Sequence, residues 1–169
     1  GWVNPFAFAR AVRAIYDGTI VLAGGIADGA ALFAPKALGC DLAYMGTRMI
    51  ATKESMAAAR YKEMLVAARL DDVLLTKAFT GLETNMLRPS IAAAGLDPDN
   101  LPMRGQIDIA KDINAAEREK PEARRWKDIW SAGHSVSGVG DIPGVAELVE
   151  RTAAEYAAAE RAMREAAVA

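Results

Sequence analysis

Two short apolar runs that both end in glycine constrain the fold more than any other feature of the sequence. Residues 19–23 (TIVLA) show little polar alternation and are followed by Gly24 and Gly25. Some twenty residues later, the run at 41–45 (DLAYM) ends at Gly46. A run without alternation is typical of a strand covered on both faces. The spacing leaves room for one helix between the strands, as in a βα unit of a parallel sheet.

The segments around these runs predict helices. Asn4 and Pro5 supply a helix cap and a first helical residue, and the helix is expected to run to residues 17–18. Residues 28–38 predict a second helix, which Pro35 bends or delays, and residues 54–68 a third. A short strand is expected within residues 71–81. This order indicates an α/β protein with a parallel sheet, either open and doubly wound or closed as a TIM barrel.

The chain divides into three parts by composition. Residues 1–81 hold the predicted βα units. Residues 82–143 are interrupted by many glycines and prolines and predict a loop-rich helical insertion or lid. Residues 144–169 are rich in alanine and glutamate and predict a C-terminal helix.

Composition excludes several classes of function. With 169 residues, of which 52% are apolar and 25% charged, the chain predicts one globular domain. A net charge of −2 gives no reason to expect nucleic acid or an anionic membrane surface as a partner. One cysteine and one histidine are too few for a structural zinc site, so no metal is expected, and Cys40 is interpreted as a buried thiol. No apolar stretch is long enough to span a membrane and no signal peptide is visible, which predicts a cytoplasmic protein.

The glycine ends of the two strands predict a phosphate site. Ligands of parallel α/β proteins gather at the C-terminal ends of the strands. Gly24 and Gly25 leave backbone N–H groups open to an anion, and the helix after residue 28 is expected to point its positive end there. Gly46 and Thr47 can contribute in the same way after the second strand. Arg48 is expected to bind either the phosphate or a nearby carboxylate.

The motifs VLAGGIADG and DLAYMGTRMIATKES resemble the nitronate monooxygenase family, formerly called 2-nitropropane dioxygenases. The resemblance continues through AFTGLETNMLRPSI, AAGLDPDNLP and RRWKDIWSAGHSVSGVGDIPGVAELVERTAAEY. It implies an FMN-dependent TIM-barrel enzyme that oxidises alkyl nitronates with O₂ to a carbonyl compound and nitrite. This chain would be the C-terminal portion of a TIM (β/α)₈ barrel with an added C-terminal helical region. Residues 1–81 would then be the last βα units of the flavin-binding barrel.

The resemblance also implies site residues. The backbone of two segments would hold the phosphate and ribityl tail of FMN: Gly24, Gly25 and Tyr44, Met45, Gly46, Thr47. The family's Ala-Gly-Gln motif near the flavin ring falls on Ala132, Gly133 and His134, with histidine in place of glutamine. His134 is therefore either a hydrogen-bond donor near the flavin or a histidine that satisfies loop backbone groups.

The family's catalytic histidine, in a Gly-Gly-His stretch, would align before Gly1. We therefore expect an N-terminally truncated piece whose catalytic residues lie upstream, and a chain that forms a homo-oligomer or depends on the missing N-terminal half. Two alternatives stay open. One is an FMN-dependent enoyl-thioester reductase, and the other is a catalytically silent binding or assembly module.

Overall fold

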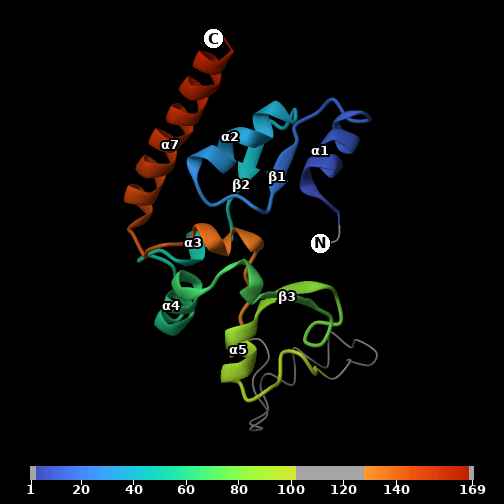
Figure 1. Cartoon of the computed structure of the whole chain (residues 1–169), viewed down its shortest axis with the longest axis vertical. Coiled ribbons are helices and arrows are strands. Elements are labelled where there is room, and N and C mark those ends of the chain that lie inside the picture. Colours follow the sequence, from blue (N-terminus) through green and yellow to red (C-terminus); the bar gives the residue numbers. More distant parts are fainter. Residues whose placement is uncertain (1–2, 102–127, 168–169) are drawn as a thin grey trace. The chain divides into compact units, whose positions relative to one another are not determined.

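The computed structural model describes residues 3–101 and 128–167, which fall into two compact units (Figure 1). The described residues of the larger unit are 3–68 and 133–167, and those of the smaller unit are 69–101 and 128–132. Residues 102–127, in the predicted loop-rich region, lie outside the described residues. They include part of the RRWKDIW stretch that carries the resemblance. Each unit has a hydrophobic cluster of its own.

The larger unit alternates helices and strands in the predicted order. The Asn4 side chain caps α1 by accepting a hydrogen bond from the Phe6 N–H at 2.9 Å. Asp28 caps α2 in the same way, accepting from the Ala31 N–H at 2.8 Å, and Pro35 lies inside that helix. The elements are α1 (Pro5–Arg13), β1 (Val21–Ala23), α2 (Gly29–Ala37), β2 (Leu42–Tyr44), α3 (Thr47–Ile50), α4 (Ala59–Ala67), η2 (His134–Gly138) and α7 (Val145–Ala166).

β1 and β2 pair in parallel, with α2 as the crossover between them. The register joins Val21 to Leu42 and Ala23 to Tyr44. On one side of the pair, Leu22 packs with Ala9, Ile20 and Cys40 in a buried cluster, so the expected burial of the thiol is confirmed. At the start of the pair, the Asp41 carboxylate accepts hydrogen bonds from the Ile20 N–H (2.8 Å) and from Arg13 (2.7 Å).

The other side of the strand pair is exposed. Val21 is 50% exposed, Leu42 59% and Tyr44 66%. The expected burial of these strands on both faces is therefore met on one face only. Side chains of a strand alternate between its faces, and α1 and α2 supply contacts to one of them.

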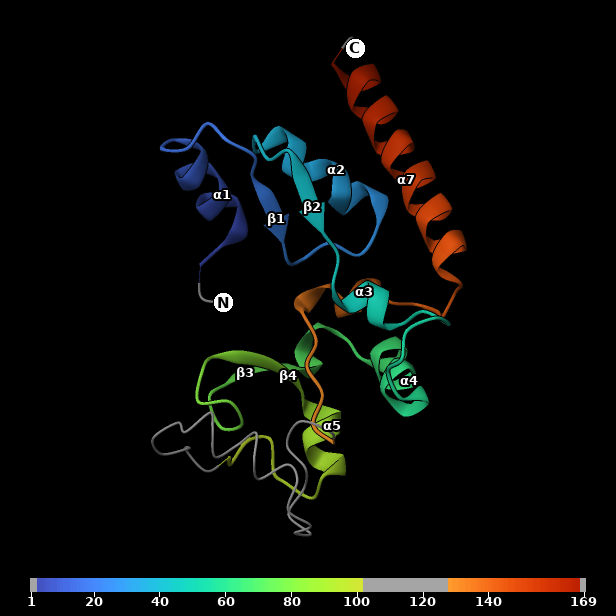
Figure 2. The same cartoon turned by 180° about the vertical axis from the view of Figure 1, so that it is seen from behind.

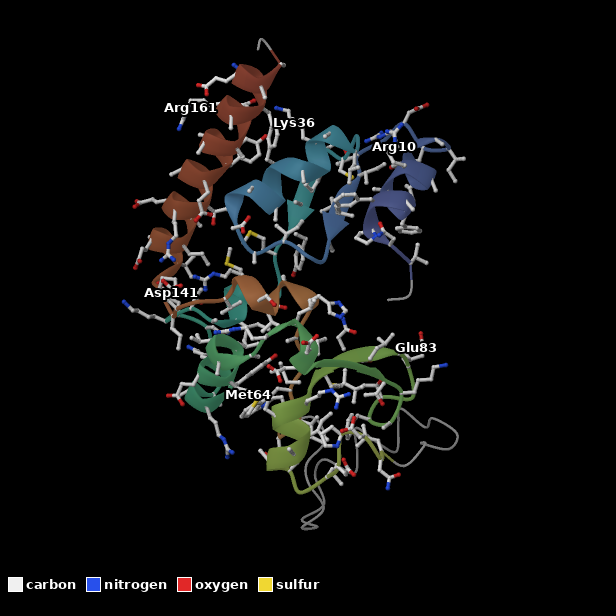
Figure 3. The ribbon with its side chains drawn as sticks, in the orientation of Figure 1. Arg10, Lys36, Met64, Glu83, Asp141 and Arg161 are labelled. Carbon is white, nitrogen blue, oxygen red and sulfur yellow. The ribbon has the colours of Figure 1, made fainter. Side chains whose placement is uncertain are left out.

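α7 packs closely against α2 in the larger unit (Figures 1 and 2). A Cβ atom added to Gly29 would overlap the backbone of α7 at Thr152 and Tyr156, so only glycine fits there. The Phe33 ring meets the Tyr156 ring edge-on, with centroids 5.5 Å apart. Lys36, labelled in Figure 3, reaches Glu160 of α7 at 3.4 Å.

The segment between α3 and α4 is held by a buried lysine. Lys62 is 9% exposed, and its ammonium donates to the carbonyls of Thr52 (2.7 Å), Ser55 (2.6 Å) and Lys53 (3.3 Å). Glu54 accepts from the Val145 N–H at the first turn of α7, at 3.0 Å from each carboxylate oxygen. The helix expected from residue 54 therefore begins only at Ala59, because the preceding residues are bound to α4 and α7 instead.

The smaller unit contains an antiparallel strand pair. It is built from η1 (Leu70–Asp72), β3 (Val73–Thr76), β4 (Thr84–Leu87) and α5 (Arg88–Ala93). β3 pairs with β4, and Met86 bridges to Ser131. Phe79, Met86, Ile91 and Ile129 form its core. The strand expected within residues 71–81 is β3, whereas β4 was not predicted, because its short sequence TNML shows little strand patterning.

Two other helix boundaries differ from expectation. α1 ends at Arg13 and not at residues 17–18. The Arg13 guanidinium donates hydrogen bonds to the carbonyls of Tyr16 and Gly18, which holds these residues outside the helix. α3 was not predicted at all.

The division of the chain at residues 81 and 143 stays a prediction. Among the described residues, no helix is long and apolar enough to cross a membrane.

Replacing Asp41 should lower stability in a pH-dependent way. The Ile20 N–H, followed by Arg13, holds the pKa of Asp41 below its ordinary value. Its contribution is therefore present above the ordinary aspartate pKa and is lost as pH falls through the lower folded value. We expect Asp41→Asn to lower the free energy of unfolding at pH 7, and the gap to wild type to close in acid. Urea titrations across pH measure it, and a gap that stays constant with pH would contradict it.

Replacing Lys62 should also destabilise the fold. Lys62→Met leaves three carbonyls without their donor, one of them on the buried Thr52, and we expect a loss of about 2 kcal/mol. The exposed neighbour Lys53 provides the matched control, since Lys53→Met removes an ammonium that binds none of these carbonyls. Equal unfolding midpoints for the two variants would contradict the role of Lys62.

Candidate functional site

The C-terminal ends of β1 and β2 lie side by side. Ala23 and Tyr44 are register partners, so Gly24 and Met45 each follow a paired position directly. The two glycine turns therefore leave the same edge of the strand pair, as the sequence predicts for parallel strands (Figure 2).

The first turn requires glycine because of its backbone. Gly24 has φ of +95° and Gly25 has φ of +76°, both in the region that other residues rarely adopt. A Cβ atom added at either position would meet nothing within 4 Å. The space beside both residues is therefore open, and no side chain separates their backbone from it.

The second turn is different. Gly46 has φ of −97°, which any residue can adopt, and an added Cβ would also meet open space. Thr47 follows as the first residue of α3 and is 8% exposed. Its Oγ1 atom accepts a hydrogen bond from the Gly133 N–H at 2.8 Å, which leaves the hydroxyl proton free to donate.

Three backbone donors at these turns have no acceptor within the described residues. The N–H groups of Gly25, Gly46 and Thr47 make no hydrogen bond in that part of the chain. Unpaired donors beside open space fit the oxygens of a phosphate group. The adjoining Tyr44 side chain is largely exposed on the open face of β2, and Met45 is half-buried.

The start of α2 does not provide the expected anion site. Its Gly29 N–H donates to the Glu155 carboxylate of α7 at 2.8 Å, and its Ala31 N–H donates to Asp28. Carboxylates therefore already occupy two donors of the first turn. The prediction that α2 offers free N–H groups to the ligand is therefore wrong for Gly29 and Ala31.

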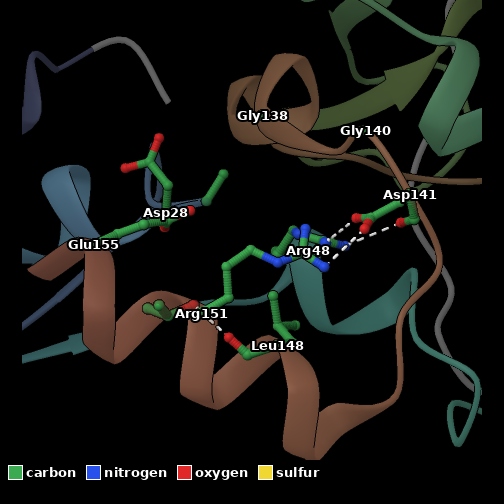
Figure 4. Close-up of a pocket in the computed structure, with 10 residues that line it drawn as sticks. Asp28, Arg48, Gly138, Gly140, Asp141, Leu148, Arg151 and Glu155 are labelled. Atoms are coloured by element: carbon green, nitrogen blue, oxygen red, sulfur yellow. Dashed lines mark hydrogen bonds and ion pairs between the residues drawn. The ribbon is translucent and has the colours of Figure 1, made fainter.

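Arg48 binds a carboxylate. It is 2% exposed, and its guanidinium forms an ion pair with Asp141 and also donates to the Asp141 carbonyl at 3.1 Å (Figure 4). Arg151 of α7 binds the other carboxylate oxygen of Asp141 at 2.8 Å. The hydrogen bond from Arg151, aided by the charge of Arg48, holds the pKa of Asp141 below its ordinary value. Of the two expectations for Arg48, the carboxylate one is confirmed.

A cavity of about 350 Å³ lies beside this ion-pair network. Its walls are formed by the network itself, by one face of α7 and by residues just before α2 and around the end of η2. The lining includes Ala27, Asp28, Gly138, Leu148, Thr152 and Glu155 (Figure 4). Acidic and basic groups on its walls are already paired with one another or with backbone N–H groups.

His134 is the first residue of η2 and is exposed. Its imidazole makes no hydrogen bond or ion pair with the described part of the chain, so the alternative role of satisfying loop backbone groups finds no contact there. The preceding Gly133 binds Thr47, which places the start of η2 next to the second glycine turn. Ala132 belongs to the smaller unit.

The family motif placed Gly133 near the flavin, but sequence reasoning missed its hydrogen bond to Thr47 and did not indicate Asp141 or Arg151 as parts of this region. Gly133 lies 86 residues from Thr47, and Asp141 lies 93 residues from Arg48, so no local pattern indicates either pairing. Within residues 3–101 and 128–167, no three His, Cys, Asp or Glu side chains gather as a metal site would require.

Comparisons with known proteins identify the family. The family model for nitronate monooxygenase matches residues 4–155. A nitronate monooxygenase of Paraburkholderia phytofirmans is 30% identical over 154 residues, covering 87% of this chain and 40% of the relative. A probable nitronate monooxygenase of Staphylococcus saprophyticus is 29% identical over 117 residues, covering 66% of the chain and 32% of the relative. The chain thus spans less than half the length of these curated relatives.

Solved structures agree with the predicted fold. FabK from Thermotoga maritima superposes with a TM-score of 0.72 at 25% identity, covering 98% of this chain and 52% of FabK. Nitroalkane oxidase from Streptomyces ansochromogenes superposes with a TM-score of 0.67 at 30% identity, covering 95% of this chain and 46% of the oxidase. The expectation of a partial TIM barrel is confirmed. With a family model matching most of its length, the chain belongs to the nitronate monooxygenase family.

Proposed function

We propose that the two glycine turns hold the phosphate of FMN, and that the enzyme containing this chain oxidises alkyl nitronates with O₂ to a carbonyl compound and nitrite. One observation carries the proposal. In a chain of the nitronate monooxygenase family, the N–H groups of Gly25, Gly46 and Thr47, which have no acceptor within residues 3–101 and 128–167, lie at the shared edge of two parallel strands. Phosphate is the anion that such an edge binds in barrel enzymes.

The residues of this chain fit the phosphate end of the cofactor. Gly24 and Gly25 turn the backbone so that no Cβ stands between it and the ligand. Gly46 and Thr47 offer two N–H groups and a hydroxyl from the second strand. Tyr44 and Met45 would lie along the ribityl tail. Bound FMN supplies the redox chemistry, while this part of the protein binds and orients it.

His134 is assigned a supporting part in the proposal. Its exposed imidazole begins η2, directly after the residue that binds Thr47. We assign it as a hydrogen-bond donor near the flavin. We assign the proton-abstracting base to no residue of this chain, and we place the substrate and O₂ contacts in the rest of the barrel. The family match favours a protein that acts on small molecules, and we propose that it does so in the cytoplasm.

The first test separates binding of the phosphate from binding of the ring. We expect Gly25→Ala to weaken FMN binding about tenfold, because a side chain at this φ strains the turn that supplies a donor, and to leave riboflavin binding unchanged. Gly95→Ala is the matched control, since Gly95 also has a positive φ (+79°) and open space beside it but lies in the smaller unit. Fluorescence titrations with both flavins measure the effect. Equal losses for FMN and riboflavin would contradict a phosphate role.

The second test concerns the reaction. An enoyl-thioester reductase is the alternative that the likeness to FabK favours. We expect the chain, placed in a chimaera that supplies the remaining barrel of the Paraburkholderia relative, to consume a nitronate and O₂ and release nitrite. NAD(P)H oxidation dependent on an enoyl thioester would favour the reductase. Flavin binding without either turnover would favour the binding or assembly module. Parallel assays of the isolated chain show whether it is active by itself.

A further inference from the structure

One short segment of the larger unit contacts residues at or directly after both glycine turns. At its start, the Gly133 N–H donates to Thr47 Oγ1 at 2.8 Å. At Gly138, an added Cβ would lie 2.5 Å from the Cβ of Ala27, two residues after Gly25, so the segment packs tightly on the residues that follow the first turn. Residues 133–141 therefore contact each of the two segments that carry the N–H groups proposed to bind the phosphate.

The end of this segment is anchored by two arginines. Asp141 binds Arg48, directly after Thr47, and Arg151 of α7. The Arg48 guanidinium is almost fully buried and also donates to the Ala51 carbonyl at the end of α3, at 3.3 Å. The orientation of α3, and with it of the Gly46–Thr47 turn, therefore depends on Asp141.

α7 also anchors the start of α2, which follows the first glycine turn. Glu155 lies four residues after Arg151, so both side chains project from one face of the helix. Glu155 accepts from the Gly29 N–H at the start of α2, while Arg151 reaches α3 through Asp141. One face of α7 thus contacts both the start of α2 and, through Asp141, α3. These are the segments next to the N–H groups proposed to bind the phosphate.

Fixed spacing matters at such a site. The strands that carry the turns are three residues long, and they pair only with each other in the described residues. A binding constellation must be held to about 0.5 Å by its supporting residues. The pairing of two such short strands offers few hydrogen bonds to hold the turns to that precision.

We propose that residues 133–141, together with Arg151 and Glu155, form a clasp that sets the spacing of the Gly25 and Gly46–Thr47 donors, and that Asp141 is a positioning residue for phosphate binding. The inference rests on the proposed function, in which these donors bind the FMN phosphate. Asp141 acts through Arg48 and need not touch the ligand.

The test compares two aspartates that each bind arginine. Asp141→Asn removes the charge between Arg48 and Arg151, whereas Asp41→Asn removes the partner of Arg13 at the opposite end of the strands. We expect Asp141→Asn to weaken FMN binding about tenfold and to change riboflavin binding less than about twofold. Asp41→Asn should leave the FMN-to-riboflavin affinity ratio at the wild-type value. Because lost stability alone lowers both affinities together, the ratio isolates positioning.

A second readout needs no flavin. The Gly133 N–H is held by Thr47, so loosening of the clasp should speed its hydrogen exchange at least about tenfold in Asp141→Asn and leave it unchanged in Asp41→Asn. If Asp141→Asn does not fold, Arg151→Gln, which removes only the outer arginine, is measured in the same way.

The outcomes separate the two proposals. If wild type does not discriminate FMN from riboflavin, the proposed phosphate site fails, and the clasp is then judged by amide exchange alone. If wild type discriminates but the Asp141 variant keeps the same ratio, the positioning role is overturned. Unchanged exchange at Gly133 in both Asp141→Asn and Arg151→Gln overturns the clasp itself.

Discussion

The parallel pairing of β1 and β2 is the constraint on which the rest of the larger unit depends. Because the strands run in the same direction, the turns after Ala23 and Tyr44 leave from one edge. Antiparallel pairing in the same register would send them to opposite ends. The crossover helix α2 enforces this direction, and Gly29 lets its first turn lie directly on α7.

Support for the two turns comes from residues far along the chain. Thr47 is bound through Gly133, and Arg48 through Asp141. Buried charges are tolerated only when they are paired and hydrogen-bonded, and Arg48 meets this condition through two carbonyls and a carboxylate. The same principle explains Lys62, whose ammonium is surrounded by three carbonyls.

The order of elements in the larger unit could be predicted from the sequence because its signals are local. Asn4 does cap a helix, and the glycines after each strand do form the turns. The start of α4 was predicted too early, because the helix propensity of the alanines around residue 58 is outweighed by tertiary contacts. Glu54 binds the first turn of α7, and Lys62 binds the Ser55 carbonyl. Arg48 could not be assigned from sequence because its partner lies 93 residues away. Likewise, nothing near residue 28 indicates that Glu155 would take a donor of α2.

The smaller unit is inserted between α4 and η2 of the larger one. The chain leaves the larger unit after Ala68 and returns at Gly133, and α4 and η2 are in contact. Both points are thus held by the larger unit, and Gly133 is also held there by its hydrogen bond to Thr47. Closing a loop costs little more free energy when the loop lengthens. Residues between these two points are therefore free to change in length and sequence while the glycine turns keep their geometry. Substitutions and insertions between Ala68 and Gly133 can therefore accumulate without disturbing the residues that hold the two turns.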